Sequence, residues 1–481
     1  MIFTQHYLAC LSHASYLIGD EVTGRAVVVD PRRDIGVYLE EADAKGLSIE
    51  RVIETHLHAD FLSGHLELAA TTGAVISFGV GAELDFPSEP LAHGQRLELG
   101  DVWLEILATP GHTPESICVV VYEHRDDRVP YGVLTGDTLF VGDVGRPDLL
   151  ASRGTGFDAP RLGRLLYRSL LEQLLKLPDE TRVFPAHGAG SSCGKQLSSE
   201  TSSTLGEQRR SNYALQPMTE DQFVDAVTEG QPVRPHYFTF DAQRNRQQHR
   251  LLDESIAPAE MPLAELLERV AAGSIPLDTR EPSDFAAGHF RGAINVGLHG
   301  RFAEWAGDVL DPDSEIVLVG DPASALESSV RLARIGFDKV VGSLADPHEL
   351  FGLRPDLVEA SSRLTIEQLA ELVGLVTDLQ LVDVRNPGET VAGTLSGAKV
   401  IPLAQLVDRL DDLDRTTPVV VHCAGGYRSL IAASLLSHTG FGDVSDLIGG
   451  YGAWTAAGLP VSRGGSLPQS AAEVTPIAAC E

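Results

Sequence analysis

Short apolar runs dominate the first part of the chain and predict strands more often than helices. Two such runs, Tyr16 to Asp20 and Ala26 to Pro31, flank a short polar turn and predict an early hairpin. Helices are expected from Asp34 to Lys45 and from Pro160 to Leu177, where leucines recur at helical spacing. Between these helices, strand patterns with glycine and proline turns continue to Val141. The pattern predicts a sandwich of sheets with helices on the outside.

The second part of the chain repeats itself, and both copies alternate strands with helices. Asp278-Thr-Arg-Glu-Pro with Gly288-His-Phe-Arg-Gly-Ala293 returns as Asp383-Val-Arg-Asn-Pro with Gly393-Thr-Leu-Ser-Gly-Ala398. In each copy a helical pattern precedes this motif and an apolar strand follows it. Such alternation predicts α/β units built on parallel sheets.

The composition excludes several classes of function. Among 481 residues, 68 acidic side chains outnumber 37 basic ones, and the net charge of -31 disfavours binding to nucleic acid or to an anionic membrane. The N-terminus lacks the basic segment and apolar core of a signal peptide, and no apolar run reaches the length of a bilayer span. The five cysteines are scattered and odd in number, which does not fit a disulfide framework. A cytoplasmic protein is therefore expected.

Candidate metal ligands gather where strand patterns end. His56, His58 and Asp60 fall at alternate positions directly after an apolar run, so an extended segment would project them together. The other candidates each follow a later strand pattern: His112 in Pro-Gly-His-Thr, Asp137 in Gly-Asp, and His187 in Pro-Ala-His-Gly. Imidazoles and carboxylates that converge suit a divalent transition metal, and their spacing does not separate zinc from iron.

In order and spacing, these motifs resemble the metallo-β-lactamase superfamily, which has an αββα sandwich fold. In the two-metal hydrolases of that superfamily, such as glyoxalase II, a histidine follows the aspartate of the first motif. Phe61 stands at that position here, and phenylalanine cannot ligate a metal. The departure predicts a single metal ion.

The repeated motif resembles the rhodanese sulfurtransferases, and its second copy carries a cysteine loop, Cys423-Ala-Gly-Gly-Tyr-Arg-Ser429, between a strand and a helix. Backbone N–H groups in such a loop, with a helix N-terminus behind it, would lower the pKa of a thiol and make Cys423 a thiolate that carries a persulfide sulfur. Gly425 and Gly426 permit the curvature, and Arg428 supplies a fixed cation for an anionic acceptor such as sulfite. In protein phosphatases the arginine of a similar loop comes one residue later, so the spacing favours sulfur chemistry.

The first copy lacks this loop. Asp321 stands where the cysteine would lie, and Gly336-Phe337 follows it two residues sooner than Gly440-Phe441 follows Cys423. A shortened loop without a thiol cannot carry sulfur. The first copy is therefore expected to be an inactive pseudo-rhodanese that serves as a spacer or docking surface.

Over nearly its whole length, the chain resembles bacterial persulfide dioxygenase–rhodanese fusions of the CstB type. The expected fold class is α/β multidomain: an αββα metallo-β-lactamase sandwich followed by two rhodanese-like α/β domains with parallel sheets. The expected boundaries are 1–255 for a dioxygenase domain with a C-terminal extension, 260–356 for the pseudo-rhodanese, 360–466 for the active rhodanese and 467–481 for a flexible tail.

The resemblance implies an enzyme that oxidises low-molecular-weight thiol persulfides with O2 to sulfite at one Fe(II) per chain. Two groups of residues carry this expectation, the metal ligands His56, His112 and Asp137 and the residues that orient ligands or substrate, His58, Asp60 and His187. Cys423 would then transfer sulfane sulfur to sulfite and give thiosulfate, which detoxifies sulfide. The alternative is a zinc-dependent, glyoxalase II-like thioester hydrolase with accessory rhodanese domains. A non-enzymatic sulfur carrier is a third hypothesis.

Several further residues are candidates near these sites. Cys193 follows His187 in a Gly/Ser loop and is expected either to position or relay persulfide or to be a small loop residue. Arg146 is expected to pair with Asp148, with a grip on the thiol carrier as the alternative, and Tyr167 either lines the thiol pocket or packs in its helix. The partners are small-molecule persulfides, O2 and sulfite, and a homodimer or homotetramer is expected. The sequence leaves open whether the carrier thiol is glutathione, coenzyme A, mycothiol or another.

Overall fold

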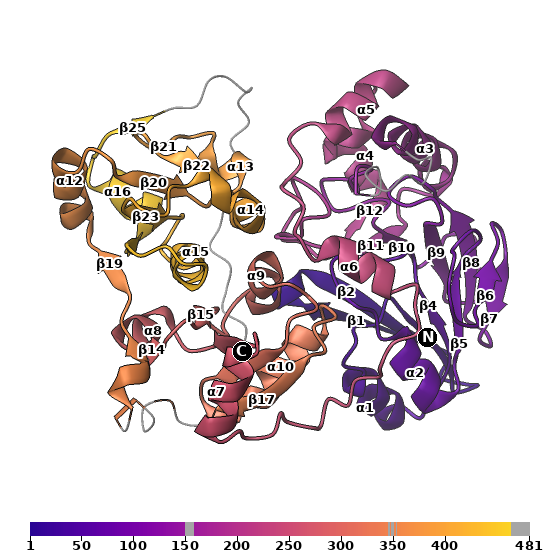
Figure 1. Ribbon diagram of the computed structural model, residues 1–481. Helices are drawn as coiled ribbons and strands as arrows, with labels where there is room; N and C mark the ends of the chain where they lie inside the picture. Colours follow the sequence, from indigo (N-terminus) through magenta and orange to yellow (C-terminus); the bar gives the residue numbers. More distant parts are fainter. Residues whose placement is uncertain (150–157, 345–346, 348–350, 353, 463–481) are drawn as a thin grey trace. The chain divides into compact units, whose positions relative to one another are not determined.

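The computed structural model describes residues 1–149, 158–344, 347, 351–352 and 354–462, and the chain divides into two compact units (Figure 1). The first unit comprises Met1–Arg234 and Phe238–Glu254, and the second comprises Pro235–Tyr237 and the chain from Ser255 onward. The expected tail, 467–481, lies outside the described residues. Among the described residues, no helix is both long and apolar enough to cross a bilayer.

The first unit contains two six-stranded sheets with helices outside them, so the predicted αββα sandwich is confirmed. The first sheet has the order β1-β2-β3-β4-β5-β6, with β1 Ile2–Leu8, β2 His13–Gly19, β3 Arg25–Val29, β4 Ser48–Ile53, β5 Val75–Gly79 and β6 Glu89–Leu91. The second has the order β12-β11-β10-β9-β8-β7, with β7 Arg96–Glu98, β8 Trp103–Ala108, β9 Ile117–Tyr122, β10 Gly132–Gly136, β11 Arg182–Pro185 and β12 Ser203–Thr204. The helices are α1 Gly36–Ala44, α2 His65–Thr72, α3 Ala159–Glu172, α4 Leu205–Ser211, α5 Glu220–Thr228 and α6 Phe238–Arg244.

Alternation along the strands explains this layering. Val27 and Val29 of β3 point into the core between the two sheets, whereas Ala26 and Val28 belong to the cluster that packs under α1 and α2. In β9 the same period of two separates Val119 in the central core from its neighbours, which contact α3 and α5. Strands buried on both faces read as continuous apolar runs, and the sequence shows such runs.

The early hairpin and the first helix are confirmed, but the long leucine-rich helix is shorter than predicted. Strands β2 and β3 pair antiparallel, and α1 lies within the expected Asp34 to Lys45 segment. Helix α3 begins after Asp158, whose side chain caps it, and ends at Glu172, where Gln173 leaves helical geometry. A 3-10 turn, Leu174–Lys176, then continues the segment and brings Leu174 into the core. The expectation of one α-helix to Leu177 is therefore wrong.

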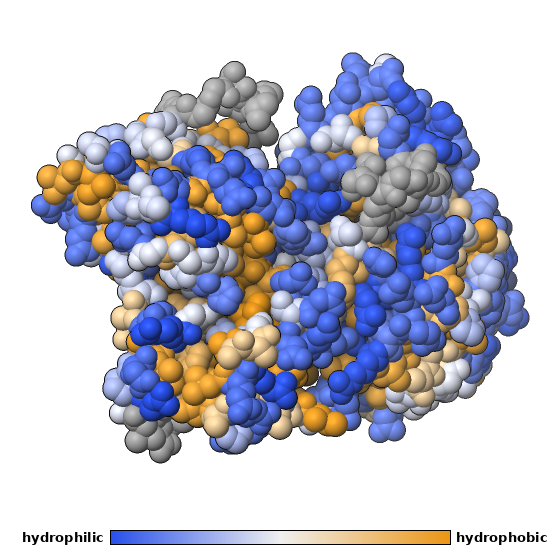
Figure 2. Space-filling view, viewed as in Figure 1, coloured by the Kyte–Doolittle hydropathy of each residue, from blue (hydrophilic) through white to orange (hydrophobic). Residues whose placement is uncertain are grey.

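The outer surfaces of α3 and α5 are largely hydrophilic (Figure 2). Arg164 and Arg168 of α3 pair with Asp221 and Glu220 at the start of α5. These exposed ion pairs each contribute little to stability, but they fit a chain whose charge is dispersed over its surface.

The second unit contains two parallel sheets, as the repeated strand–helix pattern predicted. The first copy has the sheet β15-β13-β16-β17, with β13 Ile275–Asp278, β15 Ile294–Asn295, β16 Ile316–Val319 and β17 Val340–Leu344. The second has β19-β24-β23-β20-β22, with β19 Ser362–Leu364, β20 Gln380–Asp383, β22 Lys399–Val400, β23 Val419–His422 and β24 Val444–Leu447. The helices of the first copy are α7 Leu263–Ala271, α8 Pro282–Ala287, α9 Phe302–Val309 and α10 Ala325–Ala333. Those of the second copy are α12 Ile366–Leu375, α13 Pro387–Thr390, α14 Leu403–Leu406, α15 Arg428–His438 and α16 Gly450–Ala456.

Candidate metal centre and cysteine loop

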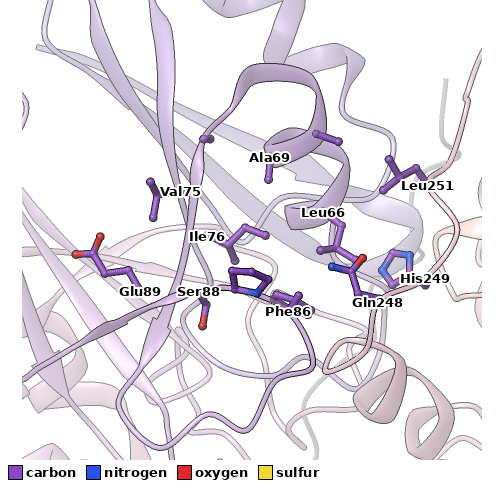
Figure 3. Close-up of a pocket in the computed structure, with 13 residues that line it drawn as sticks. Leu66, Ala69, Val75, Ile76, Phe86, Ser88, Glu89, Gln248, His249 and Leu251 are labelled. Carbon is purple, nitrogen blue, oxygen red and sulfur yellow. The ribbon is translucent and has the colours of Figure 1, made fainter.

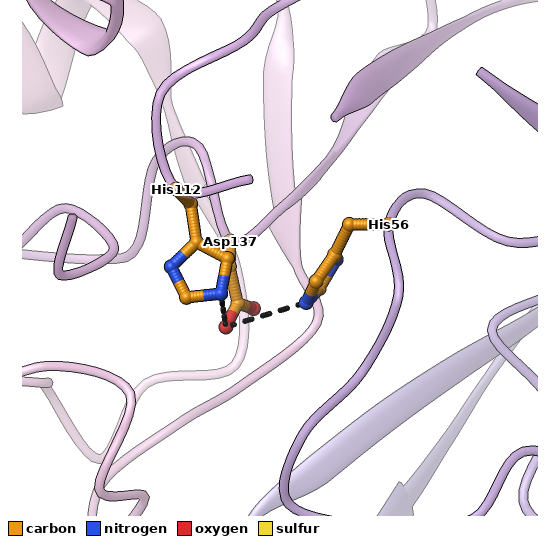
Figure 4. A group of neighbouring side chains, drawn as sticks. All are labelled: His56, His112 and Asp137. Carbon is orange, nitrogen blue, oxygen red and sulfur yellow. Dashed lines mark ion pairs between the residues drawn. The ribbon is translucent and has the colours of Figure 1, made fainter. Parts of the chain in front are cut away.

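Three strands of the first unit end at one place and deliver a histidine or an aspartate each. His56 follows β4, His112 follows β8 and Asp137 follows β10 directly. In Figure 4 the three side chains converge: His56 Nε2 lies 3.8 Å and His112 Nε2 lies 3.5 Å from Asp137 Oδ2. All three are buried, and their candidate ligand atoms lie within 4.8 Å of one another. We refer to them as the metal triad.

The two imidazoles of the metal triad are prepared to ligate through Nε2. His112 Nδ1 lies 2.9 Å from the backbone oxygen of Arg146, so an Nδ1–H donates there and leaves the Nε2 lone pair free. His56 Nδ1 lies 3.0 Å from Thr55 Oγ1. Burial lowers the pKa of both imidazoles, which keeps them in the neutral form that binds metals.

Asp137 completes the donor set with one unengaged oxygen. Its Oδ1 accepts from His187 Nδ1 at 2.7 Å, while Oδ2 is buried and has no hydrogen-bond partner among the described residues. Burial opposes ionisation, but the neighbouring His187 and His56 hold the pKa of Asp137 far below its usual range. An ionised oxygen without a partner, between two neutral imidazole nitrogens, fits a divalent transition metal.

The three residues expected to orient the ligands lie directly beside them. His187 bridges two carboxylates, with Nε2 at 2.8 Å from Asp60 Oδ2 and Nδ1 on Asp137, and these charges outweigh burial to raise the pKa of His187. His58 Nε2 lies 3.2 Å from Asp30 Oδ1. Burial opposes protonation of His58, but Asp30 and Glu54 outweigh it and raise its pKa to about 10. Both imidazoles thus contact carboxylates, and His58, Asp60 and His187 themselves form a buried group whose candidate ligand atoms lie within 4.8 Å of one another.

Phe61 fills the position where two-metal relatives have a histidine, and His13 packs on it. Phe61 is fully buried, and its ring centroid lies 4.0 Å from that of His13 and 4.4 Å from that of His58. His13, in β2, is fully buried, and neither ring nitrogen has a hydrogen-bond partner within the described part of the chain. Sequence reasoning missed His13, because a single histidine in an apolar strand carries no motif.

A second residue that the sequence did not reveal holds the loop that carries His56 and His58. Asn245, just after α6, is buried, and its Nδ2 donates to the backbone oxygens of His58 and Phe61 at 2.9 and 2.8 Å. Its Oδ1 accepts from the backbone N–H of Ser63 at 2.9 Å. One amide side chain from the C-terminal extension thus satisfies three backbone groups of the metal loop.

In the second unit, β23 leads into the predicted cysteine loop and α15 leaves it. Cys423 is 2% exposed, and the backbone N–H of Gly426 donates to its Sγ at 3.1 Å. Gly426 has a φ of +95°, and a Cβ there would lie 2.9 Å from the backbone nitrogen of Gly449. A Cβ on Gly450 would lie 2.3 Å from the Cys423 oxygen. The loop therefore requires glycine at Gly426 and behind it, whereas Gly425 is exposed with open space around it.

Arg428, expected to be a fixed cation beside the loop, is held by a carboxylate. Its two terminal nitrogens donate to the two carboxylate oxygens of Glu389 at 2.8 and 2.6 Å. In this bidentate pair the negative charge of the carboxylate balances the positive charge of the guanidinium at the start of α15. The loop therefore presents the Gly426 N–H to Sγ, and the Arg428 guanidinium lies beside it with its position fixed by Glu389.

The first copy has no equivalent of the cysteine loop. Asp321 Oδ1 accepts from the backbone N–H of Ala323 at 2.9 Å and caps a 3-10 turn, Pro322–Ser324, that leads directly into α10. The turn occupies the place of a loop around a thiol, so this copy has no group there to carry sulfur.

A crystal structure described as a metallo-beta-lactamase from Staphylococcus aureus is 33% identical in sequence to this chain. The match covers 72% of this chain and 99% of the Staphylococcus aureus chain, with a TM-score of 0.66. The sequence model of the metallo-beta-lactamase superfamily matches residues 8–187. The chain belongs to this superfamily. The rhodanese-like domain model matches residues 262–346 and 365–457, so the metallo-beta-lactamase domain is followed by two rhodanese-like domains.

Two curated relatives of the metallo-beta-lactamase domain have different activities. The mitochondrial persulfide dioxygenase ETHE1 of Bos taurus is 28% identical over 239 residues, 48% of this chain and 82% of the relative. A hydroxyacylglutathione hydrolase of a Polaromonas species is 34% identical over 176 residues, 36% of this chain and 61% of the relative. The family therefore implies a metal and leaves the reaction to be decided by the site.

The remaining candidates of the metallo-beta-lactamase domain are Cys193, whose thiol lies at the metal centre, and Arg146 and Tyr167, whose side chains bond other parts of the domain. Cys193 is 1% exposed, and its Sγ lies within 4.8 Å of candidate ligand atoms of Asp137 and His187. Burial, and then the charges of Asp60 and Asp137, raise the pKa of the Cys193 thiol well above its ordinary value. Cys193 therefore faces the centre as a neutral thiol.

Arg146 and Tyr167 have structural partners. Arg146 makes two hydrogen bonds of 2.7 Å to the carboxylate of Asp148 and also donates to the Pro232 oxygen, which matches the pairing expected of it. Tyr167 donates its hydroxyl to the Met218 oxygen at 3.0 Å and packs against Phe223, contacts that suit the helix-packing alternative.

Two cavities of the metallo-beta-lactamase domain differ in chemistry. A very small one of about 10 Å³ opens beside the metal triad and is lined by His112, Leu57, Ala59, Thr113, Leu149, Arg234, Phe238 and Ala242. A larger one of about 590 Å³ lies between α2, β5 and the segments 86–89 and 248–251 (Figure 3). Apolar side chains such as Leu66, Ile76 and Phe86 dominate its lining, and it contains no member of the metal triad. The small cavity therefore touches the metal triad at His112, and Phe238 and Ala242 of α6 line it on another side.

Proposed function

We propose that this chain oxidises low-molecular-weight thiol persulfides to sulfite with O2 at a mononuclear Fe(II) and transfers sulfane sulfur through Cys423 to sulfite. The carrying observation is the metal triad of two neutral imidazoles and one carboxylate, with Phe61 buried where two-metal relatives have a histidine ligand. Two histidines and one carboxylate with open positions are the donor set of non-haem Fe(II) oxygenases. The similarity to a persulfide dioxygenase supports the same reaction.

The oxidation balances as RSSH + O2 + H2O giving RSH, sulfite and two protons. When bound, Fe(II) supplies the one-electron chemistry that lets O2 react with sulfur. The chain's own residues would hold the ion: His56, His112 and Asp137 would supply the ligands, and His187 fixes Asp137 by its other oxygen. A donor set with a single negative charge leaves the centre net positive, which favours an anionic persulfide.

The transfer at Cys423 proceeds in two displacements. The Cys423 thiolate attacks the outer sulfur of a donor persulfide, the donor S–S bond breaks, and the carrier leaves as a thiolate. The sulfur of sulfite then attacks the outer sulfur on Cys423, thiosulfate leaves and the Cys423 thiolate is regenerated. The Gly426 N–H that points at Sγ supports the negative charge at both stages.

We also place Cys193 in the path of the persulfide, because its thiol lies beside Asp137 and His187. As a neutral thiol it donates a hydrogen bond or exchanges sulfur only after deprotonation. Replacing Cys193 by serine would then lower the rate of persulfide oxidation without changing the iron content.

A zinc-dependent thioester hydrolase is the second candidate. The observation that favours it is the 34% identity to a hydroxyacylglutathione hydrolase, together with a donor set that also suits zinc. Phe61 weighs against it, since the two-metal hydrolases need a ligand at that position.

The decisive experiment measures O2 uptake and sulfite formation from glutathione persulfide, with metal content determined on the same sample. Rapid uptake with about one iron per chain, the stoichiometry expected of a mononuclear site, is the predicted result. Zinc with no uptake, even after anaerobic reconstitution with iron and with several carrier thiols, would favour the hydrolase.

Two variants serve as reciprocal controls for the division of labour. Cys423→Ser should abolish thiosulfate formation and leave O2-dependent sulfite production intact. His112→Gln should abolish sulfite production and leave transfer from a persulfide to added sulfite intact. Loss of both activities in either variant would contradict two separate sites.

A further inference from the structure

One side chain of the cysteine loop, Tyr427, packs against the first rhodanese copy, which has no thiol in its own loop. Tyr427, between Cys423 and α15, places its ring 4.7 Å from the ring of Trp305, which lies on α9 of the first copy. A Cβ on Gly297 would lie 2.3 Å from the Tyr427 hydroxyl. The ring therefore lies directly on the backbone of the first copy, at a residue without a side chain.

The backbone segment around Tyr427 is held by hydrogen bonds from Arg331. Arg331 of α10 is buried, and its guanidinium donates to the Leu298 and Gly300 oxygens at 2.5 Å each, which fixes the segment after Gly297. Trp305 lies against the same segment, since a Cβ on Gly300 would be 3.7 Å from its ring. We define the Tyr427 socket by its residues: Gly297, Leu298, Gly300, Trp305 and Arg331.

Within the described residues, packing against Gly297 and not a hydrogen bond fixes the position of the Tyr427 hydroxyl. Its oxygen is buried and has no hydrogen-bond partner in the part of the chain that the structure describes. A buried hydroxyl without a partner costs stability, so a phenylalanine would serve better if packing were the only requirement of the position. The hydroxyl lengthens the side chain and presses it onto Gly297.

The helix behind the loop is anchored to the same copy. Leu430 belongs to the hydrophobic cluster of the first copy, together with Leu266 and Phe285. The backbone N–H of Asn295 in β15 donates to Ser434 Oγ at 3.0 Å, and His438 Nδ1 lies 2.7 Å from the Gly292 oxygen. The N-terminus of α15, which supports the anion at Cys423, is thereby fixed in place by residues of the first copy.

We propose that the thiol-free rhodanese copy is a positioning element for sulfur transfer, in which Gly297 and Tyr427 set the curvature of the cysteine loop. The proposal rests on the sulfur transfer by Cys423 proposed above. If Tyr427 moved, the peptide of Gly426 that donates to Sγ would move with it, because the two residues are adjacent. A displaced donor would stabilise the thiolate less, and the thiol would react more slowly.

The test is a double-mutant cycle in the full chain with Gly297→Ala, Tyr427→Phe and the double variant. Gly297 has no left-handed φ, so alanine is compatible with its backbone, and its Cβ would meet the Tyr427 hydroxyl most closely, with the Arg280 oxygen next at 3.3 Å. Two rates are measured: sulfur transfer to sulfite, and carboxamidomethylation of Cys423 by iodoacetamide as a function of pH, followed by mass mapping. His299→Ala is the matched control, because His299 lies two positions away with a side chain 77% exposed.

Gly297→Ala is expected to lower both rates by roughly 10- to 100-fold, since misplacement of a reacting group by about 1 Å has such effects. Phenylalanine at position 427 removes the closest contact and leaves the ring carbon at 3.2 Å, so the double variant should recover most of the loss. His299→Ala should match the wild type. The pH profile of alkylation in Gly297→Ala should shift to higher pH.

Three results would overturn the proposal: unchanged rates in Gly297→Ala, an equal loss in the double variant, or a loss without any shift of the alkylation profile. If Gly297→Ala fails to fold, Trp305→Leu removes the ring contact from the same socket without adding volume and should slow both reactions. Alkylation does not depend on sulfur transfer. A wild-type chain that alkylates at Cys423 but transfers no sulfur would refute the proposed function and leave the positioning test valid.

Discussion

Asn245→Ala tests whether the C-terminal extension holds the metal loop. The substitution removes two donated hydrogen bonds, to the His58 and Phe61 oxygens, and one accepted from the Ser63 N–H. Each buried group left without a partner costs at least about 1 kcal/mol, so opening of the loop should become easier by about 3 kcal/mol. That energy corresponds to roughly a 150-fold increase in the population of the open loop.

The assay is hydrogen exchange followed by mass spectrometry on peptides that cover the loop from Thr55 to Leu66, with the metal content measured after dialysis. In Asn245→Ala these peptides should exchange faster by about that factor, and metal should be lost more readily. Gln243→Ala, exposed on α6, is the matched control and should behave as the wild type. Exchange within about threefold of the wild type, with full metal retention, would refute the assignment of Asn245 as the clamp.

Three further outcomes are expected. Phe61→His restores the residue of the two-metal hydrolases and should raise the metal content above one per chain; an unchanged content would show that Phe61 is not the reason for a single ion. Chelation should lower the calorimetric transition of the metallo-beta-lactamase domain and not that of the second unit, and His112→Gln should already lack the difference; equal shifts of both units would contradict the assignment. Burial opposes ionisation of Glu389, but Arg428 outweighs it and holds the pKa of Glu389 below its ordinary 4.5. Their pairing should therefore stabilise the second unit fully above pH 4.5 and be lost as pH falls through the depressed pKa. In a Trp103→Phe background, urea unfolding followed by the fluorescence of Trp305 and Trp454 should show a smaller loss of stability in acid for Glu389→Gln than for the parent, and equal slopes would refute the pairing.

The layers of the fold were predictable because the pattern of apolar residues along each strand shows which of its faces are buried. Val27 and Val29 alternate with Ala26 and Val28, and the repeated Asp-x-Arg motif marks two equivalent units. The end of α3 was not predictable, because leucines continue past Gln173 at a spacing that both an α-helix and a 3-10 turn can bury.

The gathering of candidate ligands was predictable because their motifs fall at strand ends, where side chains of neighbouring strands meet, and the resemblance to the superfamily selected His56, His112 and Asp137 among them. The residues that surround and position these groups were not predictable from the sequence. Asn245 lies 187 positions from His58, to whose backbone oxygen it donates, and neither its residue type nor the local sequence pattern predicts this hydrogen bond. His13 is likewise a lone polar residue in a strand, and Arg428 looks free until its partner Glu389 is located. Partners far apart in sequence are fixed only by tertiary structure.

Helix α15 belongs to both rhodanese copies, and this makes the pair difficult to dissect. Its buried residues run without interruption from Ser429 to Leu436, so the helix has no solvent face along that stretch, and Leu430 completes the core of the first copy. A truncated chain that begins after the first copy would expose this apolar surface and favour aggregation. Heating should melt the two copies in one cooperative transition. The first copy carries no thiol in this position, yet its β15 and α9 pack against the helix of its neighbour, so the second copy depends on it for a complete core.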